Sequence, residues 1–419
     1  MPTLDIGATL PQPDECRRAP LAEVAPQLFP ASVDVAVVGA GLIGLAVAWR
    51  LAAAGLSVAV LDRAHAGAGA SLAATGMLSA AAELEPGGDD LLPLAIESQR
   101  LWPGFRDELE AASGMALDYR DEGTLVVALG REEVARLRSR HELHRRLGLG
   151  TAWLGGAEVR KLEPGLRPSV VAGLLCREDH QVDPRRVMAA LRRAFAAAGG
   201  ALVEGCAVEG VDLAGGRVAG LRTAEGRLRA DTVVLASGAS VGEGGLLPSG
   251  IVVPVRPLKG QSLALRMDPA APALRHVVWT EQVHLAPKGD GRLIVGATVE
   301  ERGFDAGVTA GGMLALLDGA RRALPGIEEL VVDAVWTGHR PTSDDDAPIL
   351  GATGVDGLLL AAGHHRNGVL LAPVTAAALA ALVLRGGMAG AAAAFGLDRF
   401  QQPGMEEGID APHRQRTGT

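Results

Sequence analysis

Cysteine is scarce in this chain, with three residues among 419. Cys16, Cys176 and Cys206 are far apart in the sequence, and no two of them form a Cys-x-x-Cys pair. This pattern excludes a disulfide-rich scaffold and offers no thiolate set for zinc. We therefore expect no metal site, and a reducing, cytoplasmic location.

Aromatic residues, basic charge and long apolar runs are also scarce. Aromatics make up 3% of the chain, with Tyr119 as the single tyrosine, so the core must consist of aliphatic and small side chains. The formal net charge of −9 argues against nucleic acid or an anionic membrane as a partner. The apolar stretch 369–384 is shorter than the roughly 20 residues of a membrane span and contains Pro373. We interpret it as a buried helix.

A glycine motif between two apolar runs is the strongest positive signal. Residues 33–38 form a short β-branched run typical of a buried strand, and Gly39, Gly41 and Gly44 follow in the order G-x-G-x-x-G. These glycines allow a tight turn, close approach of a pyrophosphate to the backbone, and close packing of the helix on the strand. The pattern predicts a dinucleotide site. A glycine turn that only packs two elements is the alternative.

The second apolar run ends in an acidic residue, which completes the motif. Residues 58–61 are apolar and lead into Asp62. A carboxylate at this place accepts hydrogen bonds from a ribose hydroxyl and disfavours a 2′-phosphorylated cofactor. The loop 63–76 that follows is rich in small residues. By itself it is either a cofactor-binding loop or an ordinary surface loop.

The central part of the chain alternates helices and strands. Residues 131–147 form a charged helix in which His141 and His144 are one residue short of the H-E-x-x-H zinc spacing, so we interpret both as solvated surface residues. Asp183 and Pro184 predict the start of a helix that ends near residue 198. A strand meander over 205–236 follows.

The last third of the chain predicts an antiparallel sheet and two turns of polar residues. Longer alternating strands occur between residues 251 and 299, with a hairpin turn at 290–291. Residues 331–336 form a strand that leads into the sequence GHRPT, and residues 358–362 form another that leads into GHHRNG. We expect a helix over 369–384.

Together these segments resemble the D-amino-acid oxidase family of flavoproteins. The resemblance covers residues 33–400 and rests on the glycine motif, on ASLAATGML, VVLASG and WTGHRPTSDDDAPILG, and most specifically on GHHRNGVLLAP. Within the family, the chain is most similar to the branch that oxidises glycine and is associated with thiazole formation in thiamine biosynthesis. The resemblance implies non-covalent FAD. A sarcosine-oxidase-like enzyme with cysteine-linked flavin is disfavoured, because no cysteine lies near residues 338–341.

The resemblance also implies the residues that contact FAD. They match the family at the ADP end, in the loop beside the flavin, at the second crossing of the cofactor and at the pyrimidine end of the flavin: Gly39, Gly41, Leu42, Ile43, Gly44, Asp62, Arg63, Ser71, Ala74, Thr75, Gly76, Met77, Val208, Ala236, Gly238, Gly338, Arg366, Asn367, Gly368, Val369 and Leu370. A helix start beside the flavin N1 would stabilise the negative charge of the reduced ring.

Three residues are candidates for substrate binding and catalysis. Arg340 matches the arginine that binds the substrate carboxylate, which its planar guanidinium suits. Arg366 is the second arginine of the implied pocket. His284 occupies the position of a family tyrosine, and we expect its charge to vary with pH.

The implied architecture is α/β: a Rossmann-like FAD-binding domain interleaved with an α+β substrate domain built on an antiparallel sheet. We assign 33–115, 176–250 and 331–400 to the FAD domain and 116–175 and 251–330 to the substrate domain. Residues 1–32, which lack a secretory signal pattern, form an N-terminal arm, and 401–419 a flexible tail. A homo-oligomer is also expected.

The implied activity is oxidative deamination of glycine, sarcosine or a small D-amino acid. In this reaction a hydride passes from the substrate Cα to flavin N5, the imino product is hydrolysed, and dioxygen is reduced to H2O2. Two alternatives stay open. One is a dehydrogenase that passes electrons to another acceptor, and the other is a non-catalytic flavoprotein subunit.

Overall fold

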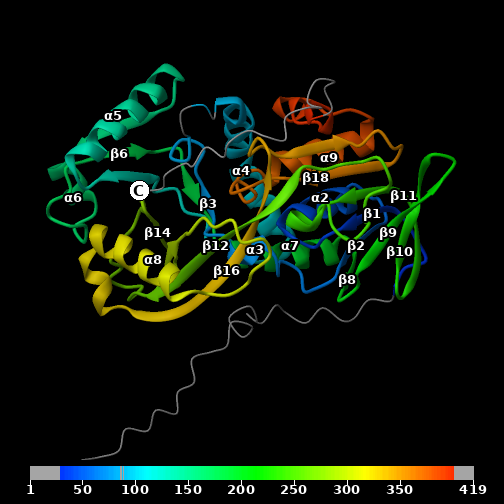
Figure 1. Ribbon diagram of the computed structural model, residues 1–419, viewed down its shortest axis with the longest axis horizontal. Helices are drawn as coiled ribbons and strands as arrows, with labels where there is room; N and C mark the ends of the chain where they lie inside the picture. Colours follow the sequence, from blue (N-terminus) through cyan, green and yellow to red (C-terminus); the bar gives the residue numbers. More distant parts are fainter. Residues whose placement is uncertain (1–28, 85–86, 88, 401–419) are drawn as a thin grey trace, which may run out of the picture.

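The computed structural model describes residues 29–84, 87 and 89–400 (Figure 1). Two large sheets dominate it, one in each half of the molecule, and a small pairing of β3 (Met77–Leu78) with β7 (His180–Gln181) lies apart from both. Most of the predicted arm 1–32, the whole tail 401–419 and Cys16 lie outside the described residues.

The first sheet is parallel at its centre and carries the glycine motif. Its parallel strands follow one another in the order β18 (Leu358–Ala362), β11 (Gly226–Leu235), β1 (Ser32–Val38), β2 (Val58–Asp62) and β8 (Ala201–Glu204). The antiparallel strand β17 (Ile349–Ala352) flanks β18, and the hairpin of β9 (Val208–Ala214) and β10 (Arg217–Thr223) extends from β11.

The strands of this sheet are apolar on both sides, so both faces must be covered, and helices cover one of them. Val35, Val37 and Val60 are fully or almost fully buried and belong to one core cluster with the covering helices. Those helices are α2 (Leu42–Ala53), α4 (Leu92–Ser113), α7 (Pro184–Ala197) and α9 (Ala372–Arg385). The opposite face packs on the β9–β10 hairpin and on the segment 241–253.

The second sheet is antiparallel except between β13 and β4. The strand order is β16 (Val331–Ser343), β12 (Val255–Arg266), β15 (Arg292–Gly296), β14 (His284–Pro287), β13 (Val277–Trp279), β4 (Thr124–Ala128), β6 (Ala172–Cys176) and β5 (Thr151–Gly155). Three helices belong to this half: α5 (Arg131–Arg146), α6 (Gly156–Leu162) and α8 (Ala310–Ala323).

Short elements complete the described chain. They are α3 (Ala70–Ala73) and five 3-10 turns at Asp89–Leu91, Gly238–Ser240, Pro325–Glu329, Ala391–Ala394 and Leu397–Phe400. The α/β architecture with a Rossmann-like domain and an antiparallel second sheet is therefore confirmed. The domain boundaries remain a prediction.

The strands β12 and β16 pair from Val255 with Ser343 to Arg266 with Val331. They run from the second sheet to the middle of the molecule (Figure 1). Residues 331–343 thus belong to the second sheet, although they fall within the predicted FAD-domain segment 331–400. The strand alone could not reveal this, because its partner β12 is about 75 positions away in the sequence.

Two helix starts test the predictions that were based on capping residues and proline. As predicted, α7 begins after Asp183, whose carboxylate accepts a hydrogen bond from the Arg185 N–H at 2.9 Å. The helix predicted over 369–384 instead begins at Ala372. Pro373 explains the shift, because proline lacks an N–H and fits the first helical turn, where none is needed.

His144 corrects the interpretation of α5 as a helix with two solvated histidines. Its side chain is fully buried, and neither ring nitrogen has a hydrogen-bond partner among the described residues. Burial, with Arg140 and His141 nearby, lowers the pKa of His144 to about 4. His141 is partly exposed and lies near the Thr151 hydroxyl.

No helix in the described part of the chain is long and apolar enough to cross a membrane. Among the same residues, no cluster of three histidine, cysteine or acidic side chains is arranged to hold a metal ion.

Candidate active site

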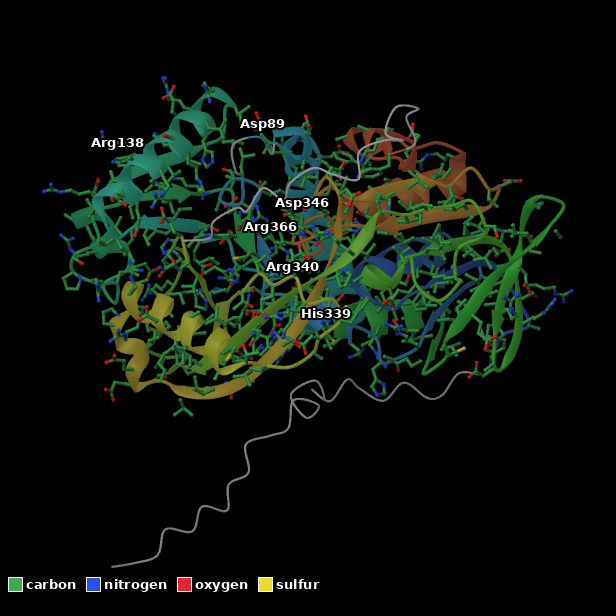
Figure 2. All side chains as sticks on the ribbon, in the orientation of Figure 1. Asp89, Arg138, His339, Arg340, Asp346 and Arg366 are labelled. Atoms are coloured by element: carbon green, nitrogen blue, oxygen red, sulfur yellow. The ribbon has the colours of Figure 1, made fainter. Side chains whose placement is uncertain are left out.

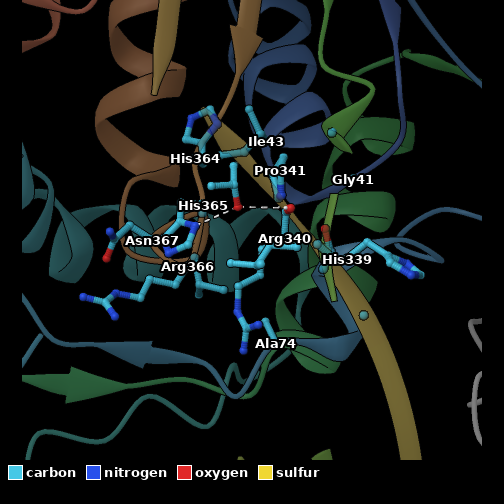
Figure 3. A pocket seen from close by; sticks show the side chains of 18 of the residues that line it. Gly41, Ile43, Ala74, His339, Arg340, Pro341, His364, His365, Arg366 and Asn367 are labelled. Carbon is cyan, nitrogen blue, oxygen red and sulfur yellow. Dashed lines mark hydrogen bonds between the residues drawn. The ribbon is translucent and has the colours of Figure 1, made fainter. Parts of the chain in front are cut away.

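A cavity of about 1770 Å³ lies between the two sheets. Its walls come from the glycine turn, the loop 67–84, the ends of β12, β14 and β16, and the turn after β18. Figure 2 shows Arg340 and Arg366 at this central position, and Figure 3 shows the side chains close up.

The glycine turn forms the floor of one end of the cavity. Gly39 has φ +107°, and a Cβ on Gly44 would lie 2.0 Å from the Gly39 carbonyl oxygen, so the helix packs directly on the turn. Gly41 is the N-cap of α2 without a capping side chain of its own. Gly39 and Gly41 line the cavity, whereas Gly44 only permits the packing.

Polar side chains form hydrogen bonds that fix the residues around this turn. Asp62 accepts hydrogen bonds from the N–H groups of Ala40 at 2.7 Å and Ala64 at 2.8 Å, and burial raises its pKa. Ser71 accepts from the Leu42 N–H at 2.8 Å, which ties the loop 63–76 to the start of α2. Arg63 donates to the Ser240 hydroxyl at 2.8 Å.

Except for Gly44, all the predicted cofactor-binding residues line this one cavity. Beyond those described above, they are Leu42, Ile43, Ala74, Thr75, Gly76, Met77, Val208, Ala236, Gly238, Gly338, Arg366, Asn367, Gly368, Val369 and Leu370. Their contacts with a cofactor remain predictions.

The turn 367–371 is held from behind by α4. The Leu370 carbonyl accepts hydrogen bonds from the Ser98 hydroxyl at 2.6 Å and from the Trp102 indole at 2.9 Å. Both donors are fully buried. The cavity wall at Asn367 and Gly368 is therefore fixed by a packed helix.

Arg340 enters the cavity from β16. Its guanidinium lies over Gly260 of β12, where a Cβ would come within 2.5 Å of Nη1. Nη1 donates to the backbone carbonyls of Thr298 at 3.2 Å and Lys259 at 3.5 Å, and no described acidic residue forms an ion pair with Arg340. Burial, and then the charge of Arg366, lower the pKa of Arg340, which nevertheless stays protonated.

His284 is the first residue of β14 and faces the same cavity. Its Nε2 lies 2.8 Å from the Thr75 hydroxyl, and its ring lies 5.5 Å from that of Trp279, centre to centre. Burial, followed by the charges of Arg340, Lys288 and Arg366, lowers the pKa of His284 to about 3. The expectation of a pH-dependent charge is therefore wrong, because the ring stays neutral at physiological pH.

Arg366 lies in the turn after β18 and points in a different direction from Arg340 (Figure 3). Its Nε is 3.1 Å from the Glu83 carboxylate, and its Nη2 donates to the Glu83 carbonyl at 3.2 Å. The two candidate arginines thus differ, because Arg366 has a carboxylate partner within the protein.

The sequence interpretation missed Gly260 and Glu83. An isolated glycine within a strand often marks close approach of another group, and Gly260 in the run LKGQSL carries that signal. Glu83 follows three alanines in the run SAAAE, and its pairing with a residue 283 positions away left no local signal.

The cavity fits a flavin dinucleotide. A helix start whose N-cap is a glycine suits a pyrophosphate, and Gly338 packs on Ala73 so closely that a Cβ would lie 2.4 Å from the alanine Cβ. The flavin end would lie between the loop 74–77, Gly338 and the turn 367–370, next to Arg340.

Comparison with known proteins agrees with this geometry. The chain is 36% identical to glycine oxidase of Geobacillus kaustophilus over 87% of the chain and 97% of that protein. A crystal structure of that organism's glycine oxidase covers 90% of the chain with a TM-score of 0.84. The bifunctional protein ThiO/ThiG of Synechocystis is 37% identical over 88% of the chain, which spans 54% of that longer protein.

The predicted family is confirmed by the match of its sequence profile. The profile named DAO, described as FAD dependent oxidoreductase, matches residues 34–382, which include the glycine turn, His284, Arg340 and Arg366. The chain therefore belongs to the DAO family of FAD-dependent oxidoreductases.

Proposed function

We propose that this enzyme oxidises glycine or another small amino acid, with dioxygen as the electron acceptor. The observation that carries the proposal is Arg340, a half-buried arginine without an acidic partner among the described residues, in the cavity that suits FAD. A desolvated guanidinium with unused donors is a site for a carboxylate. The glycine oxidases at 36% and 33% identity support the choice of substrate.

Arg340 would orient the substrate through its carboxylate. Its two backbone acceptors fix the guanidinium plane, so that the remaining N–H groups form a rigid fork. A carboxylate on this fork leaves the Cα and the amine of a small substrate directed toward the flavin end of the cavity. FAD, when bound, accepts the two electrons of the oxidation.

His284 would add a hydrogen bond without adding charge. The neutral imidazole joins β14 to Thr75 in the loop that forms the flavin end of the cavity. It therefore holds two walls of the cavity together. A tyrosine hydroxyl, which the resemblance places here, would provide the same kind of contact.

A link to thiazole formation is proposed from the relatives. The ThiO/ThiG proteins of Synechocystis and of Trichormus variabilis match 88% of this chain, which covers 54% and 55% of their length. The substrate range, the release of H2O2 and a homo-oligomeric state remain predictions.

Reduction of the bound flavin by a panel of amino acids without oxygen tests the proposal. Glycine, sarcosine, D-alanine and L-alanine are added to the yellow holoenzyme, bleaching is followed, and H2O2 is measured after air is admitted. We expect glycine or sarcosine to bleach the flavin and H2O2 to form. Bleaching without H2O2 would identify a dehydrogenase, and no bleaching by any amine would contradict the proposal.

Arg340→Ala tests the residue on which the proposed function rests. We expect the KM for glycine to rise roughly 100-fold while FAD stays bound, because a lost pair of charged hydrogen bonds costs about 3 kcal/mol. Arg138→Ala on the outer side of α5 (Figure 2) is the control and should leave KM unchanged. An unchanged KM in Arg340→Ala would remove this arginine from the substrate site.

A further inference from the structure

We propose that Lys259 is a positioning residue for the substrate carboxylate. It holds the loop 297–309 against β12 and thereby fixes the two backbone carbonyls that orient the Arg340 guanidinium. The inference deepens the proposed function and rests on it, because Arg340 is the residue through which Lys259 would act.

Lys259 and Arg340 lie on opposite faces of the β12–β16 pair. Lys259 pairs with His339, and residues directly opposite each other in two strands project to the same face. Successive side chains along a strand alternate, so Arg340 projects to the other face, toward the cavity. Figure 3 shows His339 and Arg340 pointing in different directions from β16. Lys259 therefore acts on the substrate site through the backbone and not by contact.

The Lys259 ammonium is completely buried and lies against two carboxylates of the loop. Its side chain is 0% exposed, and Nζ lies 2.6 Å from the Asp305 carboxylate and 3.7 Å from that of Glu300. The hydrogen bond from Lys259 lowers the pKa of Asp305. Because a buried ammonium without a charged partner is costly, the segment that carries these carboxylates must stay over the lysine.

The backbone of Lys259 also pairs with the loop, at the place where Arg340 is held. The Lys259 N–H donates to the Glu300 carbonyl at 3.0 Å, and the Glu300 N–H donates to the Lys259 carbonyl at 2.9 Å. Arg340 Nη1 lies 3.5 Å from the same Lys259 carbonyl and 3.2 Å from the carbonyl of Thr298. Both acceptors of the guanidinium thus lie where the loop joins β12.

Neutral side chains anchor the rest of the loop. The Gln261 amide donates to the Glu300 carboxylate at 2.7 Å and accepts a hydrogen bond from the Thr309 N–H at 2.8 Å. The Thr337 hydroxyl donates to the Ala306 carbonyl at 3.0 Å. These contacts do not involve the lysine, so its replacement should shift the start of the loop without detaching the whole segment.

Lys259→Met and Asp305→Ala, both as holoenzymes, remove the ion pair from either side. We expect kcat/KM for glycine to fall roughly tenfold in Lys259→Met and about threefold in Asp305→Ala, because a displaced guanidinium orients the carboxylate less well. Asp305→Glu keeps the charge and should retain most of the activity. Unchanged kcat/KM in both Lys259→Met and Asp305→Ala would overturn the inference.

Asp318→Ala on α8 is the matched control. The side chains of Asp318 and Asp305 are both 51% exposed, and each carboxylate pairs with a basic residue, which for Asp318 is Arg321 at 3.2 Å. We expect this variant to leave kcat/KM unchanged. A loss equal to that of Asp305→Ala would overturn the inference, because any exposed ion pair of this half would then have the same effect.

The double variant Lys259→Met/Arg340→Ala separates positioning from general damage. If Lys259 acts through Arg340, its replacement should change kcat/KM by less than about twofold once the guanidinium is absent. The same loss with and without the guanidinium would overturn the inference. Asp305→Ala/Arg340→Ala provides the same comparison if Lys259→Met fails to fold or to retain FAD.

Two measurements that need no turnover separate this inference from the proposed function. Mass spectrometry follows trypsin cleavage after Arg302, an exposed residue of the loop, and the visible flavin spectrum gives the Kd of acetate. In Asp305→Ala we expect cleavage to be about threefold faster or more, and acetate to bind about threefold more weakly or more.

Both shifts in an enzyme that no amine reduces would refute the oxidase proposal and leave the role of Lys259 intact. Unchanged cleavage and unchanged acetate affinity in an active oxidase would overturn the role of Lys259 alone. Faster cleavage with unchanged acetate affinity would also overturn it, because the ion pair would then stabilise the loop without positioning Arg340.

Discussion

At the scale of single residues, the site depends on a missing side chain as much as on a present one. Gly260 leaves the space in which the Arg340 guanidinium lies flat on β12. The arginine is therefore placed by the strand opposite it and by two backbone carbonyls. Substrate binding should be sensitive to small changes on β12 that leave every charge intact.

Gly260→Ala tests this dependence. Because the new methyl would lie 2.5 Å from Nη1, the guanidinium must move, and we expect the KM for glycine to rise about tenfold or more with FAD still bound. Gly311→Ala in the first turn of α8 is the matched control, since a Cβ there has no neighbour within 4 Å. Identical KM values for the two variants would show that Arg340 has room to adjust.

His284 gives a prediction about pH. With a pKa of about 3, its ring is neutral throughout the range from pH 6 to 9, so it adds no ionisation to the pH profile of kcat/KM. His284→Phe removes the bond to Thr75 and should lower kcat/KM roughly 3- to 10-fold, the effect of one neutral hydrogen bond. The shape of the profile should stay the same. Loss of an acid limb in the variant would show that His284 titrates in this range.

At the scale of elements, α5 contains one buried polar side chain that lowers the stability of the folded protein. His144 is buried without a hydrogen-bond partner among the described residues, and its folded-state pKa of about 4 is below the ordinary value of 6.5. Between these pH values the unfolded chain binds the additional proton, so the contribution of this residue to stability rises with pH across that window. The free energy of unfolding therefore decreases as the pH falls from 6.5 toward 4.

His144→Leu should therefore stabilise the protein more at pH 5 than at pH 8. Removal of an unpaired buried polar group contributes about 1 to 3 kcal/mol at either pH, and the proton linkage adds to this only at pH 5. Thermal unfolding of both proteins at the two pH values measures the difference. Equal shifts in Tm would show that the folded protein binds a proton on His144.

Local patterns and distant pairings account for what the sequence could and could not predict. The glycine turn at 39–44 and the Asp183 cap depend on neighbouring residues, so both were predicted correctly. The membership of β16 in the second sheet depends on β12, and the partner of Arg366 lies 283 positions earlier in the chain. Buried His144 resembles its solvated neighbours in a charged helix, and only tertiary packing distinguishes it.

At the scale of the whole molecule, the cavity separates the two sheets. Its walls include residues from both, so a cofactor that fills it bridges the two halves of the structure. Ligands that bind only the folded state stabilise it according to their concentration relative to Kd. The cofactor should therefore be a major stabilising component of this protein.

Addition of FAD to the apoprotein should raise the Tm, with about 2.7 kcal/mol of stabilisation at 100 times Kd. FMN at the same concentration should have a smaller effect, because it lacks the adenosine part that would lie on the α2 side of the cavity. Thermal unfolding monitored by circular dichroism measures both shifts. Equal shifts with FAD and FMN would argue against a contribution from the glycine turn.

The pairing of β12 with β16 also bears on which insertions and deletions the protein can accept. A one-residue change in a strand reverses which side chains face the cavity, and it would exchange Arg340 for a neighbour. The ladder contains one irregularity, where Ala264 pairs with Ala334 and Leu265 with Val332, so that Asp333 is left over. Variation in the length of β16 during evolution should therefore be confined to the segment before Ala334, while the distance from Ala334 to Arg340 stays constant.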